Sequence, residues 1–305
     1  MSAPSFTGVY PILPTPFHED ESLDLESMAR LVRFMASLGM DGVTVLGVMG
    51  EANRLTDDER WQILRTSVEA AGGMPVIAGV THPGTAATVA LCRQAADAGI
   101  AGVMVSPSRE PNPSDERVFE YFARVGADGG LPMALQDHPP SSQVFMGAPL
   151  LRRMVEEIPG VACLKLEHAP TPAKLTALWG AHPGRKVPVL MGLGALYAGF
   201  DLLRGADGFM TGFAFPEALK AMVAAARNGD QPTLLGLYTR FLPLIVYEQQ
   251  PALALRKEIY LLRGLIDSPR VRHPGGQIDP VSAGEVRNLL ETILAGEDLK
   301  KPLGV

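Results

Sequence analysis

One lysine of this sequence stands where a charged side chain is unusual. Lys165 lies within the apolar run Val161–Leu166, whereas we expect the other six lysines to be solvated on helical or loop-like sequence, at positions 174, 186, 220, 257, 300 and 301. Burial disfavours an ammonium group, lowers its pKa and makes the neutral amine available as a nucleophile. A neutral amine can form a Schiff base with a carbonyl compound. The alternative is that Lys165 forms a structural ion pair with a neighbouring carboxylate.

Glu167 follows this lysine by two residues. Side chains alternate along a strand, so Lys165 and Glu167 point to the same face. A carboxylate beside the amine could carry protons to and from a substrate, or it could simply neutralise the lysine. The sequence leaves both roles open.

Two further segments could contact a substrate. In GVMGE, residues 47–51, the glycines allow the backbone amides of Val48 and Met49 to turn towards a carboxylate, although the pattern also suits an ordinary turn. The run QDHP, residues 136–139, closes another apolar segment. Asp137 and His138 in that run are either acid–base groups or hydrogen-bonded bystanders.

These residues belong to a repeating pattern of short apolar runs and amphipathic segments. The runs have the composition of strands buried on both faces, and they are Val9–Leu13, Val43–Leu46, Val76–Val80, Val103–Ser106, Met133–Gln136, Ala162–Leu166, Val189–Met191 and Phe209–Thr211. Helical patterns lie between them, for example at Leu25–Leu38, Asp57–Ala71, Thr85–Ala98 and Pro149–Glu157. Such strand–helix units predict an α/β protein with a parallel sheet closed into a (β/α)8 TIM barrel, with its active site at the carboxyl ends of the strands.

The chain is expected to divide into a barrel, residues 1–229, and a C-terminal helical extension, residues 230–305. The extension has three helical patterns, at Pro232–Tyr247, Ala252–Leu265 and Val281–Leu294, which we expect to pack on the barrel. An open doubly wound sheet is the alternative fold. The glycine-rich phosphate loop of such a sheet is missing after the first strand, where the sequence has PTPF at residues 14–17.

The composition argues against several classes of protein. The chain is 47% apolar and 20% charged, as soluble globular proteins are. A formal net charge of −6 argues against a nucleic-acid or anionic-membrane partner, and no apolar stretch approaches the roughly 20 residues of a transmembrane helix. We see no leader sequence and expect Cys92 and Cys163 to be buried free thiols, so the predicted location is cytoplasmic.

A metal-dependent aldolase is a further alternative. The six histidines are scattered, without a His-x-His motif or a helical i,i+4 pair. Only His82, Asp137 and His138 together would offer a ligand set. We therefore expect no metal and no other cofactor.

Four motifs stand in a recognisable order and spacing. They are GV…TPF at residues 8–17, GVMGE at 47–51 followed by LTDDER at 55–60, CLKLE at 163–167 and GADG at 205–208. In these residues the sequence resembles the dihydrodipicolinate synthase/N-acetylneuraminate lyase family of Schiff-base lyases, from Gly8 to about Leu294. The resemblance implies a (β/α)8 barrel with a helical tail, a Schiff base on Lys165 and, commonly, a homotetramer.

The chain departs from that family where the family relays protons. Val48 and Met49 stand where two hydroxyl residues are usual, and Gln136, which cannot exchange a proton at neutral pH, stands in place of the relay tyrosine. Ser141 falls near the arginine with which the synthases bind the carboxylate of their aldehyde substrate, and Ser108-Arg109 fall near their paired tyrosines. Lysine-biosynthetic chemistry is therefore not expected.

The L-2-keto-3-deoxyarabonate dehydratases of this family share several of these departures. They resemble this chain in QDxP at strand five, KxE at strand six and TGxxFP after strand eight, which match residues 136–139, 165–167 and 211–216. In that branch, the glutamate that corresponds to Glu167 is the acid–base replacement for the tyrosine. That branch departs from GxxGE, which this chain retains, so the two substrates can differ.

These observations predict a lyase that binds a small 2-oxo acid as a Schiff base, more specifically a dehydratase of a 2-keto-3-deoxy sugar acid. The catalytic residues would be Lys165, which attacks the carbonyl, and Glu167, which moves the C3 proton. The expected substrate-binding residues are Val48, Met49, Gln136, Asp137, His138, Gly192 and Thr211. The alternatives are a pyruvate-dependent aldolase or synthase on the same scaffold and a non-catalytic barrel that binds a keto acid.

Overall fold

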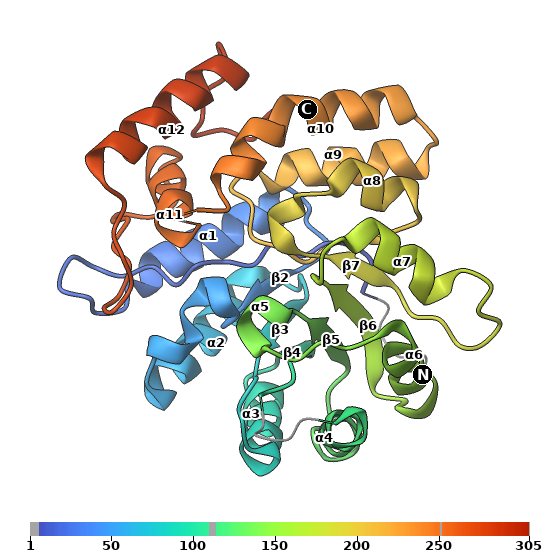
Figure 1. The fold of residues 1–305 in the computed structure, drawn as a ribbon. Helices are drawn as coiled ribbons and strands as arrows, with labels where there is room; N and C mark the ends of the chain where they lie inside the picture. The colour runs from blue at the N-terminus through green and yellow to red at the C-terminus, as the bar shows by residue number, and fades with distance from the viewer. Residues whose placement is uncertain (1–5, 110–113, 251, 305) are drawn as a thin grey trace.

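The computed structural model describes residues 6–109, 114–250 and 252–304, and its centre is a barrel of parallel strands (Figure 1). The strands are β1 (Gly8–Val9), β2 (Val43–Val45), β3 (Val76–Gly79), β4 (Gly102–Val105), β5 (Met133–Asp137), β6 (Val161–Leu166), β7 (Val189–Met191) and β8 (Gly208–Phe209). Neighbours pair in the order β1-β8-β7-β6-β5-β4-β3-β2. A parallel bridge between Ile12 and Thr44 joins the two ends of this sheet. The predicted (β/α)8 barrel is confirmed, and the open doubly wound sheet is wrong.

The strands β1 and β8 are shorter than predicted. Pro11 has no N–H to donate, so the first strand is interrupted before the bridge at Ile12. The two strands approach so closely that a Cβ on Gly208 would lie 1.8 Å from the Gly8 carbonyl oxygen. Only glycine fits at position 208, because the backbones of β1 and β8 lie in close contact there.

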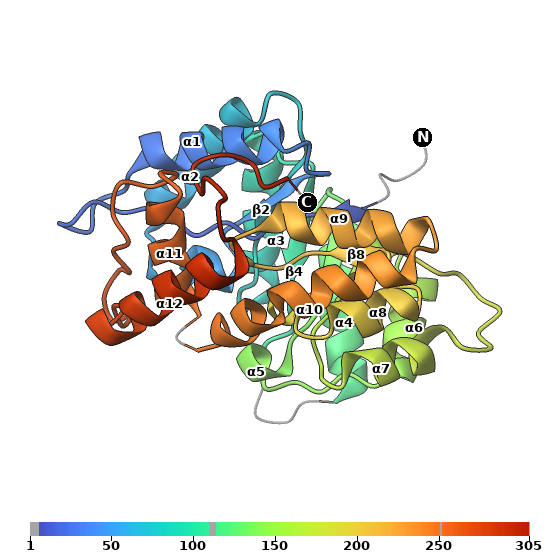
Figure 2. The ribbon, with the colours of Figure 1, turned by 90° about the horizontal axis from the view of Figure 1, so that it is seen from above.

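A ring of helices covers the outside of the barrel (Figures 1 and 2). Its members are α1 (Leu25–Ser37), α2 (Asp57–Ala71), α3 (Thr85–Asp97), α4 (Asp115–Asp128), α6 (Ala148–Glu157), α7 (Thr171–Trp179), α8 (Ala198–Leu203) and α9 (Pro216–Arg227). The short helix α5 (Pro139–Ser142) is not part of this ring and lies in front of β3 and β4 in Figure 1. A capping box opens α2, because the Thr56 side chain accepts from the Glu59 amide while the Glu59 side chain accepts from the Thr56 amide.

The barrel lumen is filled by apolar side chains towards the amino ends of the strands. One cluster of buried residues there comprises Tyr10, Ile12, Ile77, Met104, Ala134, Cys163, Leu190 and Met210. Cys163 and Cys92 are both buried and free, as expected. Because this apolar cluster fills the lumen, we expect polar active-site groups at the carboxyl ends of the strands.

Three helices follow the barrel: α10 (Gln231–Tyr247), α11 (Leu253–Leu262) and α12 (Pro280–Ile293). In both views α10 runs beside α9, and α11 and α12 lie together against the outside of the barrel (Figures 1 and 2). The expected domain boundary falls between the end of α9 and the start of α10. No helix of the described residues is long and apolar enough to cross a membrane.

Candidate active site

Lys165 and Glu167 form a buried pair at the carboxyl end of β6. The Lys165 ammonium nitrogen lies 2.9 Å from Glu167 Oε2, and the two side chains are only 2% and 8% exposed. Both follow Cys163 on the luminal face, as strand alternation predicts. The pair thus places an amine and a proton acceptor side by side in the lumen.

Gln136 and the loop after β7 hold the carboxylate of Glu167. Gln136 lies beside Lys165 in the β5–β6 register, and its Nε2 donates to Glu167 Oε2 at 2.7 Å. The Leu193 amide donates to the other carboxylate oxygen at 3.2 Å. Gly192 makes room for this contact, because a Cβ at that position would lie 2.2 Å from Glu167 Oε1. Each carboxylate oxygen therefore has a fixed orientation.

The electrostatic surroundings favour the ionised form of Glu167. Burial alone would raise the pKa of Glu167, but the Lys165 charge, His138 and the Gln136 hydrogen bond together lower it below its ordinary value. Burial also lowers the pKa of His138, against the opposing effect of Glu167. The site thus favours a carboxylate at Glu167 beside the amino group of Lys165.

A cavity of about 590 Å³ lies over the carboxyl ends of β2 to β5. Gln136 forms part of its wall and connects it to Glu167. Much of the remaining wall is polar and comprises Asn53, Arg60, Thr81, His82, Ser106, Ser108, Arg109, Ser141, Ser142 and Gln143. The buried Ser106 hydroxyl has no hydrogen-bond partner in the described part of the chain. The cavity offers donors and acceptors for a hydroxylated ligand.

The loop after β2 borders the same cavity. Val48 and Met49 begin a short 3-10 turn, Val48–Gly50, and the first N–H groups of such a turn have no partner within it. The Val48 side chain is 60% exposed and lines the cavity, whereas Met49 packs against the luminal cluster. The two side chains therefore occupy positions at the site without offering a hydroxyl group, and only their amides can bind an anion.

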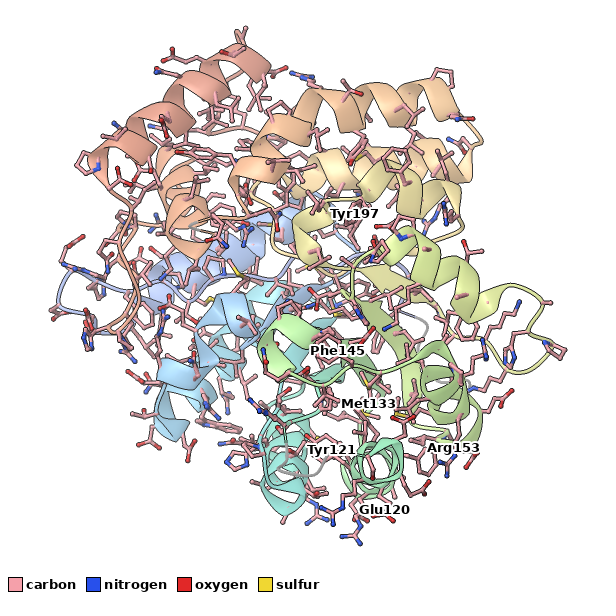
Figure 3. All side chains as sticks on the ribbon, in the orientation of Figure 1. Glu120, Tyr121, Met133, Phe145, Arg153 and Tyr197 are labelled. Atoms are coloured by element: carbon pink, nitrogen blue, oxygen red, sulfur yellow. The ribbon has the colours of Figure 1, made fainter. Side chains whose placement is uncertain are left out.

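The structure does not bring Asp137 into the lumen. Its side chain points to the helix layer, where Lys174 of α7 donates to Asp137, to the Met146 carbonyl and to His168 Nδ1. His168 in turn packs edge-on against Phe145, which lies on the segment after α5 (Figure 3). Alternation explains this, because neighbours of Gln136 in the strand face the opposite way.

His138 and Thr211 lie near the site but have partners of their own. His138 Nδ1 is 2.7 Å from the Ser141 hydroxyl, and Thr211 accepts a hydrogen bond from the Gly194 amide at 2.8 Å. Thr211 thereby holds the same β7 loop that donates to Glu167. Both residues support the site from its edge.

The expectation that six lysines are solvated is wrong for Lys257 and Lys174. Lys257 is fully buried and pairs with Glu51 at 2.6 Å, and the Lys174 side chain is 11% exposed in its contact with Asp137. In both cases a partner distant in sequence compensates the charge, which a helical pattern alone does not reveal.

Sequence reasoning also missed several residues of the cavity wall. Ser106 ends the predicted fourth strand, so the rule that active sites lie at the carboxyl ends of barrel strands points to it. Asn53 and Arg60 belong to the segments that follow the β2 loop, and no pattern in the sequence marks them as facing the cavity. Among the described residues, no group of three or more His, Cys, Asp or Glu side chains could hold a metal ion.

Known proteins resemble this chain along nearly its whole length. It is 34% identical to an L-2-keto-3-deoxyarabonate dehydratase of Azospirillum brasilense, over 93% of this chain and 94% of that protein. It is 32% identical to a 4-hydroxy-tetrahydrodipicolinate synthase of Mycolicibacterium gilvum, over 72% of both chains.

Solved structures of the same kind superpose closely. The crystal structure of a dihydrodipicolinate synthase from Rhodopseudomonas palustris has a TM-score of 0.90 at 37% identity and covers 94% of this chain and 97% of its own. A prophage protein of the dihydrodipicolinic acid synthase family from E. coli K12, in complex with pyruvate, has a TM-score of 0.85 at 26% identity, over 95% and 99% of the two chains. The sequence matches the dihydrodipicolinate synthetase family over residues 5–293. On these matches and this barrel, the chain belongs to the dihydrodipicolinate synthetase family.

Proposed function

We propose that the protein is a Schiff-base lyase acting on a 2-oxo acid, and specifically a dehydratase of a 2-keto-3-deoxy sugar acid. The observation that carries this proposal is the Lys165–Glu167 pair, with Gln136 holding the glutamate in place. The named relative that is a dehydratase of a 2-keto-3-deoxy acid supports the substrate class.

The proposed reaction runs through an enamine. The neutral Lys165 amine attacks the C2 carbonyl, and loss of water gives an iminium ion that acidifies the protons at C3. Glu167 removes a C3 proton, and the electron pair of that C–H bond forms the C2–C3 double bond of the enamine. The enamine expels the C4 hydroxyl group, which takes up the proton that Glu167 removed from C3 and leaves as water. Hydrolysis of the remaining imine releases the product and Lys165.

The cavity supports a hydroxylated substrate. Its volume of about 590 Å³ lies within the range of small-molecule sites, roughly 300–1,000 Å³. In this proposal the Val48 and Met49 amides, at the start of the 3-10 turn, bind the C1 carboxylate, and Ser106 and its polar neighbours bind the hydroxyl groups of the tail. A polar wall that satisfies such groups also favours them over apolar tails.

An aldolase on the same scaffold is the second candidate, because retro-aldol cleavage also proceeds through the enamine. The named relatives that are tetrahydrodipicolinate synthases favour condensation. Gln136 and Ser141 lack the proton-relay and anion-binding groups that the family resemblance assigns to those positions. We therefore expect condensation of pyruvate with aspartate semialdehyde to stay below a kcat/KM of about 10⁴ per molar per second, an ordinary enzyme value.

Incubation with a panel of 2-keto-3-deoxy acids and mass spectrometry of the products tests the proposal. A product that has lost one water supports dehydration. Pyruvate plus an aldehyde from every member of the panel would establish the aldolase instead. A protein that binds these acids without any turnover would be the non-catalytic barrel.

Several properties remain predictions beside this proposal. They are the homotetramer, the cytoplasmic location, the absence of a cofactor and the division of the chain at residue 229. Size-exclusion chromatography with light scattering measures the first of them directly.

A further inference from the structure

The described part of the segment 248–272 of the C-terminal extension, residues 248–250 and 252–272, contacts three loops at the carboxyl ends of the barrel strands. These are the loops after β2, β7 and β8. We infer that this segment is a positioning element of the active site and that Lys257 is the residue that fixes the carboxylate-binding loop 47–51. The inference rests on the proposed role of that loop in the Schiff-base reaction.

Lys257 reaches the β2 loop from α11. Its ammonium group donates to Glu51 Oε1 at 2.6 Å and to the Arg270 carbonyl at 2.6 Å, and both paired side chains are fully buried. The ammonium nitrogen also lies 4.6 Å from the centre of the Phe17 ring. No polar atom of the cavity wall takes part in these contacts, so the lysine acts through Glu51 alone.

Glu51 is the anchor of the loop. Its backbone has φ 55° and ψ 29°, a left-handed conformation that costs a residue other than glycine of order 1–3 kcal/mol. Its second oxygen accepts from Arg54 at 2.7 Å and from the Arg272 amide at 3.0 Å. These contacts hold the strained turn, and the Glu51 amide in turn donates to the Val48 carbonyl at 3.1 Å. A shift of Glu51 is thus transmitted to the amides of Val48 and Met49.

The loop after β7 is held by Gln249, which follows the end of α10. Gln249 Nε2 donates to the Leu193 carbonyl at 3.2 Å, and the Leu193 amide donates to Glu167. Gly194 in this loop has a φ of +60°, and a Cβ there would lie 2.5 Å from Gln249 Nε2. The loop and the extension therefore fit together at a glycine next to the catalytic carboxylate.

The loop after β8 is held at both backbone groups of one residue, Ala214. Glu248, paired with Arg256 at 2.8 Å, accepts from the Ala214 amide at 3.1 Å. Arg263 donates to the Ala214 carbonyl at 2.6 Å and pairs with Glu217. As at Gly194, the extension approaches a glycine of the loop closely, because a Cβ on Gly212 would lie 2.5 Å from Arg256 Nη1.

Positioning accounts for these pairs better than stability does. A buried ion pair adds little net stability compared with apolar side chains of the same volume, because desolvation opposes the attraction. Here Arg256, Lys257 and Arg263, in α11 or directly after it, contact loops that border the site. Their partners Glu248, Glu51 and Glu217 make further hydrogen bonds to backbone groups or to an arginine. Displacements of about 1 Å in such loops can change rates by about 10².

Lys257→Met tests the inference, with Arg287→Met as its control. Arg287 of α12 also pairs with a glutamate of α11, Glu258, but its side chain is 54% exposed and does not touch a barrel loop. The measurement is the pyruvate concentration that gives half-maximal borohydride-trapped adduct. We expect it to rise at least about 10-fold in Lys257→Met, with Lys165 still the modified residue at saturation, and to stay unchanged in the control.

Two further measurements keep the test decisive. Glu51→Gln preserves the shape of the anchor, and we expect it to raise the same concentration should Lys257→Met not fold. Hydrogen exchange of the peptide spanning residues 46–55 should be faster in Lys257→Met than in the control, whether or not pyruvate is trapped. A folded variant with wild-type pyruvate affinity and wild-type exchange in that peptide overturns the inference. A wild-type protein that traps no pyruvate instead contradicts the proposed function, and the exchange comparison then decides the inference alone.

Discussion

Two lysines of this molecule are buried beside a glutamate, and their surroundings differ. Lys165 lies 2.9 Å from Glu167 inside the barrel, where the partner glutamate also binds Gln136 of the cavity wall. Lys257 lies 2.6 Å from Glu51 between α11 and the β2 loop, with a backbone carbonyl and an aromatic ring as its other neighbours. The first pair is thus connected to the wall of the cavity through Gln136. The side chains of the second pair are fully buried and are not part of that wall.

The comparison shows that burial alone does not identify a nucleophilic lysine. Burial lowers the pKa of Lys257 to about 8, although Glu51 opposes the shift, yet no carbonyl compound can reach its nitrogen through the sealed surroundings. What distinguishes Lys165 is its place at the carboxyl end of a strand, next to a residue that lines the cavity. We therefore propose that the same residue pair is reactive at Lys165 and structural at Lys257.

Removal of each lysine should separate the two roles most strongly. Lys165→Ala is expected to lose turnover by at least about 10⁴, because covalent catalysis needs the amine, while the protein stays folded. Lys257→Met should retain a measurable kcat. Steady-state kinetics with circular dichroism of both variants checks this, and full activity in Lys165→Ala would end the assignment.

The two glutamates should differ in the kinetic parameter that they affect. Glu167→Gln is expected to lower kcat by about 10² to 10⁴, the usual contribution of general acid–base catalysis, while the imine still forms. Glu51→Gln should act mainly on KM. Rapid-quench trapping of the imine beside steady-state rates makes the distinction. Near wild-type turnover in Glu167→Gln, with normal imine formation, would leave Glu167 only the role of neutralising Lys165.

A third buried acid, Asp201, should affect stability without affecting catalysis. Burial raises the pKa of Asp201 to about 7, against the hydrogen bond from Thr171 and the charge of Arg204. The native state therefore binds a proton that the unfolded state releases between about pH 4 and pH 7, so this group's contribution to stability falls as pH rises through that window.

Asp201→Asn removes that penalty and keeps an acceptor for Thr171. We expect a Tm higher by a few degrees at pH 8, at roughly 2–4 °C per kcal/mol for a chain of this size, and no gain at pH 4. Thermal melts at the two pH values measure the difference. An equal effect at both pH values would show that ionisation of Asp201 is not the cause.

The parts of the site that the sequence predicted are those set by local periodicity. The apolar run around Lys165 indicated a strand, and alternation placed Glu167 on the same face, as the structure confirms. The same alternation, applied to β5, would have directed Asp137 away from Gln136 and His138. That error came from treating a run of polar residues as one unit.

The remaining features depend on contacts between residues far apart in the chain. Lys257 was expected to be solvated because α11 has a helical pattern, but its partner Glu51 lies 206 residues earlier. Arg272 reaches Glu59 over a similar separation. Such pairs follow from how the extension packs on the barrel, and neither propensity nor spacing encodes them.

Borohydride trapping with pyruvate tests the central claim most directly. We expect one reduced adduct per chain, found by peptide mapping on Lys165 and lost in Lys165→Ala, while Lys257 stays unmodified in the wild-type protein. An adduct on Lys257 or another lysine, or an adduct that persists in Lys165→Ala, would contradict the account.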